Sequence, residues 1–101
     1  MTIYNKLVRD LIPDHIVSKG GECKFHTASP EEFLQKLLEK ILEEGREIIA
    51  NCSLEEIADM MEVLEAVVEL KGYDWGEIKK KQQEKKEKRG GFTKKIILEE
   101  S

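Results

Sequence analysis

The sequence predicts an all-α protein, an antiparallel helical bundle completed by oligomerisation. Three observations favour this class. Two Ser-x-x-Glu sequences are typical of helix starts, glycines follow the helical patterns, and only two residues connect the first two long segments. A connection that short makes consecutive helices antiparallel neighbours.

The helix boundaries are indicated by local signals. Ser29 and Ser53 are capping residues with a glutamate three positions on, and Pro30 suits a first helical turn. Glycine pairs at 20–21 and 90–91 are stop signals for the helices before them. We therefore expect a short helix over 13–19 and long helices over about 29–50, 53–71 and 74–89.

The remaining segments are expected to be extended. Residues 22–27 lead into the first long helix, and residues 92–98, which contain Lys-Lys-Ile-Ile-Leu, predict a short C-terminal extended arm, either a strand or a docking arm. The 101 residues are expected to form one domain, 1–101. So small a domain buries only a modest fraction of its own surface, so we expect a second copy to complete the bundle.

Composition excludes several classes of protein. The net charge of −4 argues against a general nucleic-acid binder. No apolar run approaches the roughly 20 residues that cross a bilayer, and the first residues lack a signal-peptide core, so we expect a cytoplasmic protein without a membrane partner. Cys23 and Cys52 have neither zinc-site nor disulfide-framework spacing and are expected to be reduced.

Carboxylates interrupt the apolar stripe of the first long helix. At about 100° per residue, its apolar side chains fill one half of the helical wheel. Glu44 falls inside that half, three residues past Ile41 and four before Ile48, and Glu47 lies at its edge. The apolar residues that define this stripe are Phe33, Leu34, Leu37, Leu38, Ile41, Leu42, Ile48 and Ile49.

The second long helix repeats the arrangement, with Glu56 inside its apolar arc and Asp59 at the edge. Each helix therefore points a pair of carboxylates, three residues apart, at its neighbour. Four converging carboxylates repel one another unless protons or a cation neutralise them. Mg²⁺ fits best, because it prefers hard oxygen ligands and joins carboxylates to substrate phosphates. No histidine or cysteine belongs to the cluster, which disfavours zinc.

Simpler roles remain open for these residues. Glu56 is the third residue after Ser53 and would complete a capping box there. The side chain of Glu44 would alternatively bend to reach solvent near one end of the helix, where the core is thin. Glu62 lies on an outward arc and is expected to be solvated, or to support Asp59 from outside the cluster.

Five segments carry a resemblance to a known superfamily. Residues 43–47 (Glu-Glu-Gly-Arg-Glu) and 56–59 (Glu-Ile-Ala-Asp) resemble the Glu-Glu-x-x-Glu … Glu-x-x-Asp signature of MazG-like and phosphoribosyl-ATP pyrophosphohydrolase-like proteins. Residues 5–10 (Asn-Lys-Leu-Val-Arg-Asp), 12–13 (Ile-Pro) and 88–92 (Lys-Arg-Gly-Gly-Phe) are similar to segments of its small single-domain members. Only eight residues separate the two parts of the signature, fewer than in many MazG proteins.

The resemblance implies an all-α dimer or tetramer that hydrolyses a nucleoside triphosphate between its α and β phosphates, releasing a monophosphate and pyrophosphate. It implies house-cleaning of non-standard nucleotides or, alternatively, the phosphoribosyl-ATP step of histidine biosynthesis. By position, Mg²⁺ would be held by Glu44, Glu47, Glu56 and Asp59. We expect Glu47 to be the general base, with Glu44 as the second catalytic carboxylate.

Cations beyond the metal are needed for the charge on the phosphates. Lys6, Arg9, Lys88 and Arg89 are the expected substrate-binding residues, although Lys88 and Arg89 also suit an ordinary helix C-terminus. A different class of function stays open, a non-catalytic helical oligomer or nucleotide-binding module. Such a module would have no need of acidic residues on its buried stripes.

Overall fold

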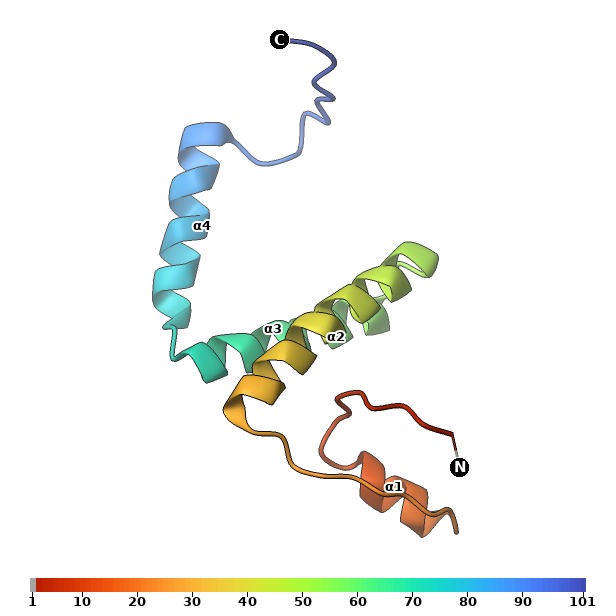
Figure 1. The fold of residues 1–101 in the computed structure, drawn as a ribbon. Coiled ribbons are helices and arrows are strands. Elements are labelled where there is room, and N and C mark those ends of the chain that lie inside the picture. The colour runs from red at the N-terminus through yellow and green to blue at the C-terminus, as the bar shows by residue number, and fades with distance from the viewer. Residues whose placement is uncertain (1) are drawn as a thin grey trace. The chain divides into compact units, whose positions relative to one another are not determined.

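A computed structural model describes residues 2–101, which form four helices and no strand (Figure 1). The expected all-α class is therefore confirmed. Each boundary lies within one residue of the prediction. The helices are α1 (Ile12–Ser18), α2 (Pro30–Ala50), α3 (Leu54–Lys71) and α4 (Trp75–Arg89).

The predicted caps are formed. The Ser29 hydroxyl accepts a hydrogen bond from the backbone N–H of Glu32 at 3.2 Å, and the Ser53 hydroxyl accepts one from the N–H of Glu56 at 3.3 Å. Each satisfies a backbone donor that has no partner inside the helix. At the end of α4, Gly90 has φ of +82°, a left-handed conformation that glycine adopts without steric cost.

The chain divides into two compact units, the first ending at Lys71 and the second beginning at Gly72. In the first unit, α2 and α3 lie side by side, joined by residues 51–53 (yellow and green in Figure 1). Their seam contains the small core, Leu37, Val63 and Val68. One charged residue, Glu44, is buried with them.

Much of the predicted apolar stripe is exposed on the surface of this pair of helices. The side chain of Leu42 on α2 is 62% exposed and that of Met61 on α3 is 56% exposed. Two helices alone cannot cover an apolar arc this wide, because each buries only the side that faces the other. Completion of the bundle by a second copy stays a prediction.

The second unit contains α4 and the tail. None of the α4 residues is buried. A turn follows over residues 92–94, and residues 95–101 have no regular secondary structure, so the strand alternative for the tail is not formed and the docking arm stays a prediction. Across residues 2–101, none of the helices has the length and apolar character needed to span a membrane.

Candidate metal centre and pocket

Three of the four predicted carboxylates come together on neighbouring helices. Glu44 of α2 and Glu56 and Asp59 of α3 each offer a carboxylate oxygen, and these oxygens lie within 4.8 Å of one another. Glu44 is buried, whereas Glu56 and Asp59 are half-buried. We call these three residues the acidic triad. Helices α2 and α3 have capped N-termini, a short link and a shared packing seam, which together fix the backbone positions of the triad residues.

The donor set of the triad suits a hard cation. Oxygens that bind one Mg²⁺ at 2.0–2.1 Å lie at most about 4.2 Å apart, so the observed spread closes with small side-chain rotations. All three donors are carboxylate oxygens, which magnesium and calcium prefer and which zinc rarely takes exclusively. A divalent cation therefore fits the chemistry and spacing of these groups.

The negative charges of the triad and of Glu47 lie close enough together to repel one another. Burial raises the pKa of Glu56, and the charges of Glu47, Asp59 and Glu44 raise it further. The charged form of Glu56 is therefore disfavoured unless a cation stands beside it.

Glu47 is the fourth predicted ligand, and the structure leaves it outside the triad. Its side chain is exposed, as its place at the edge of the stripe predicts. Its charge is nevertheless close enough to raise the pKa of Glu56. Glu47 thus borders the triad, and its assignment as a ligand or a base stays a prediction.

The capping-box alternative for Glu56 is not formed. In a capping box the glutamate carboxylate accepts from the backbone N–H of the capping serine. Here the N–H of Ser53 donates to the backbone oxygen of Asn51 at 2.8 Å. The Glu56 carboxylate therefore has no capping role to perform and lies with the triad instead.

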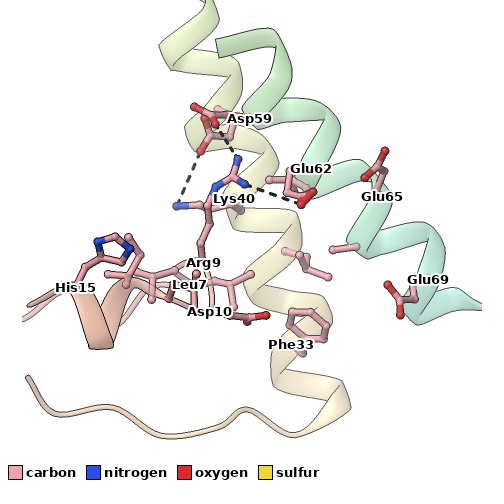
Figure 2. Close-up of a pocket in the computed structure, with 17 residues that line it drawn as sticks. Leu7, Arg9, Asp10, His15, Phe33, Lys40, Asp59, Glu62, Glu65 and Glu69 are labelled. Carbon is pink, nitrogen blue, oxygen red and sulfur yellow. Dashed lines mark hydrogen bonds and ion pairs between the residues drawn. The ribbon is translucent and has the colours of Figure 1, made fainter. Parts of the chain in front are cut away.

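Arg9 reaches the triad from the segment before α1. Its Nη2 donates to Oδ1 of Asp59 at 2.8 Å, and its Nη1 lies 3.9 Å from Oε1 of Glu62 (Figure 2). Sequence reasoning assigned Arg9 to a substrate phosphate. In the structure its guanidinium bridges Asp59 of the triad and Glu62, which lies one helical turn further along α3. The assignment of Arg9 to a substrate phosphate stays a prediction.

Two lysines stand beside the α2 side of the triad. Lys6 Nζ is 3.0 Å from Glu43 Oε1, and Lys40 Nζ is 3.2 Å from Glu43 Oε2 and 3.9 Å from Glu44 Oε1. Hydrogen bonds from Lys6 and from Lys40 lower the pKa of Glu43. Sequence reasoning missed Lys40. The available signal was its place four residues before Glu44, which puts both on one helix face.

A pocket of about 690 Å³ opens beside the triad between residues 7–15, α2 and α3 (Figure 2). Such a volume is typical of small-molecule sites. Its charged wall has two cations, Arg9 and Lys40, and six carboxylates, so an anionic ligand there requires a bound cation. The carboxylates are Glu44 and Asp59 of the triad and, outside it, Asp10, Glu62, Glu65 and Glu69. The apolar residues of the wall were not predicted as part of a site. The apolar wall consists of Leu7, Val8, Leu11, Ile12, Phe33, Leu37, Val63 and Ala66.

The remaining predicted cations belong to the second unit. Lys88 and Arg89 lie in the last turn of α4, where positive charge favours the helix C-terminus. Both are exposed. Their assignment to the substrate stays a prediction.

Comparison of this chain with protein-family models, with curated proteins and with solved structures gives no match. The functional argument therefore rests on the triad, the cations and the pocket.

Proposed function

We propose that this protein is a Mg²⁺-dependent nucleotide pyrophosphohydrolase that cleaves a nucleoside triphosphate between its α and β phosphates. One observation carries the proposal: two residues of the acidic triad line a pocket that also presents Arg9 and Lys40 and an apolar wall. A nucleotide offers the matching chemistry, with a polyphosphate for the metal and cations and a base for the apolar wall.

The triad residues Glu44, Glu56 and Asp59 would hold Mg²⁺. When bound, Mg²⁺ supplies charge neutralisation for the polyphosphate and a lowered pKa for bound water. Arg9 and Lys40, which line the pocket, would add positive charge near the leaving group, and Lys6 would support them through its contact with Glu43 beside Lys40. We assign the general base to Glu47, because it is exposed and borders the triad.

The proposed reaction is a simple hydrolysis. The oxygen of a water attacks the α-phosphorus, and the bond from that phosphorus to the bridging oxygen of the β-phosphate breaks. Glu47 takes the proton from water, and pyrophosphate leaves with the bonding electron pair. The products are a nucleoside monophosphate and pyrophosphate.

A nucleotide panel tests this proposal. Pure protein is incubated with standard and modified nucleoside triphosphates and with phosphoribosyl-ATP, with Mg²⁺ or with a chelator, and both products are measured. We expect pyrophosphate and monophosphate in equal amounts, only with Mg²⁺. The preferred substrate decides between house-cleaning and the histidine-pathway step. Release of inorganic phosphate alone, or no product from any member of the panel, contradicts the proposal.

A second candidate is a non-catalytic helical oligomer that binds nucleotide or a partner. The exposed apolar side chains of α2 and α3, including Leu42 and Met61, favour it. It differs from the first candidate in one measurable respect, because any nucleotide that binds would remain intact. The same panel, read by a binding measurement, therefore separates the two.

A further inference from the structure

Arg9 makes the longest-range charged contact with the acidic triad. It stands fifty positions before Asp59 in the sequence, yet its guanidinium donates to that carboxylate at 2.8 Å. A second nitrogen lies 3.9 Å from Glu62, which is not part of the triad. Arg9 is thus the counter-ion of one triad carboxylate and has a second carboxylate within reach.

The same side chain lines the pocket. The Arg9 side chain is 57% exposed, and Arg9 forms part of the pocket wall with Lys40 (Figure 2). A guanidinium has five N–H donors in a planar fork, and the contacts to Asp59 and Glu62 involve two of its nitrogens. Arg9 therefore has donors for an anion in the pocket while it stays near Glu62.

We propose that Arg9 couples cation binding to anion binding at this site, by exchanging Asp59 for a phosphate group when a divalent cation takes Asp59. This inference rests on the proposed function. A positive charge beside Asp59 opposes a divalent cation on the same carboxylate. Once the cation neutralises Asp59, the attraction that holds Arg9 there is weakened, and Arg9 is available to phosphate.

The coupling has a consequence in each direction. A cation on the triad strengthens phosphate binding, and phosphate strengthens cation binding by the same factor, because binding free energies are reciprocal. Without phosphate, Arg9 competes with the cation. With phosphate, Arg9 assists it. The exchange of Arg9 between Asp59 and phosphate would thus favour the protein with both cation and phosphate bound over the protein with either ligand alone.

Calorimetric titration with Mg²⁺ alone tests the first half of the proposal. We compare the wild-type protein with Arg9→Gln, and use Lys36→Gln as the matched control. Lys36 donates to the backbone oxygen of Asn5 at 2.8 Å, so its loss removes the same charge and loosens the same N-terminal segment without touching the triad. We expect Arg9→Gln to bind Mg²⁺ roughly three- to tenfold tighter, and Lys36→Gln to match wild type.

The second half is tested by repeating the Mg²⁺ titration with inorganic phosphate at constant ionic strength. Phosphate should tighten Mg²⁺ binding by a clearly larger factor in wild type than in Arg9→Gln. Circular dichroism and melting curves establish that each variant is folded; Arg9 is exposed, so we expect the fold to survive.

The outcomes separate this inference from the function on which it rests. If wild type binds no Mg²⁺, both fall. If wild type binds Mg²⁺ but Arg9→Gln binds it equally or more weakly, the coupling is overturned and the proposed function stands. An equal phosphate effect in wild type and Arg9→Gln, or a Lys36→Gln protein that behaves like Arg9→Gln, also overturns the coupling.

Discussion

Helices α2 and α4 are both rich in charged residues, but they use their glutamates differently. On α2 one face of the helix is apolar and the other is charged, and Glu44 is buried on the apolar face. On α4 no residue is buried, and Glu84 is exposed to solvent. An exposed carboxylate keeps its hydration, whereas one in an apolar seam loses it. The position of a glutamate relative to the apolar stripe therefore says more about function than the number of glutamates in the chain.

The largest expected effect tests this contrast directly. Glu44→Gln and Glu56→Gln should each lower turnover on the order of a hundredfold or more, because each removes a proposed metal ligand. Glu84→Gln on α4 and Glu55→Gln on the exposed side of α3 should stay within about twofold of wild type. Initial rates of pyrophosphate release at saturating Mg²⁺ provide the measurement. Equal losses at all four positions would indicate general electrostatics instead of a defined site.

A second test concerns the exposed apolar side chains of the α2–α3 pair, which are several, whereas the exposed large apolar side chain of α4 is Trp75 at its first position. Light scattering should give wild-type protein a mass of at least twice 11.7 kDa at micromolar concentration. Leu42→Lys should lower that mass to the monomer value, because a charge at the centre of an apolar interface is costly to bury. Ile97→Lys places the same charge on an exposed apolar residue of the C-terminal tail. It tests whether the tail, instead of a second copy's helices, covers the exposed apolar side chains, and we expect it to leave the mass unchanged. A monomeric wild type would remove the second-copy prediction.

Thermal stability should respond to Mg²⁺ through the triad. A cation that binds the folded triad stabilises it by about 1.4 kcal/mol at ten times its dissociation constant, a rise of roughly 7 °C in Tm for a domain this small. Glu44→Gln should be at least as stable as wild type without Mg²⁺, because one repelling charge is lost, and should gain less from Mg²⁺. A melting curve insensitive to Mg²⁺, with a Glu44→Gln protein that is simply less stable, would make these carboxylates structural.

The smallest expected effect is the pH dependence contributed by Glu56. Because its pKa is raised in the folded protein, its charge destabilises the fold once pH exceeds the unfolded value of about 4.3, and the penalty is complete above the folded pKa. Lowering pH without Mg²⁺ should therefore improve wild type relative to Glu56→Gln. Chemical denaturation of both proteins at several pH values measures the difference. A gap that is constant with pH would contradict the raised pKa.

The sequence predicted the helices better than the site. Capping serines and terminal glycines act within a few residues, so Ser29, Ser53 and Gly90 revealed the boundaries without tertiary information. Helical periodicity similarly identified Glu44 as a carboxylate on the buried face.

The pocket could not be predicted in the same way. One of its walls is residues 7–12, most of which precede α1 and have no periodic pattern. Their placement depends on tertiary contacts between residues far apart in the sequence, such as Arg9 with Asp59 and Lys6 with Glu43. Glu47 shows a related limit, since periodicity places it at the edge of the stripe but does not fix the distance to its neighbours. Local patterns predicted the helix faces, and tertiary contacts decided the site.

The short link between α2 and α3 also affects the order of folding. Glu44 and Asp59 are only fifteen positions apart, so the loop that brings them together closes at small entropic cost. Local helical contacts of this kind form early, before a distant segment such as the one carrying Arg9 has docked. We expect the triad charges to repel one another in the transition state for folding, before their arginine counter-ion has docked. We therefore expect dissolved Mg²⁺ to speed refolding of the chain as well as to slow its unfolding.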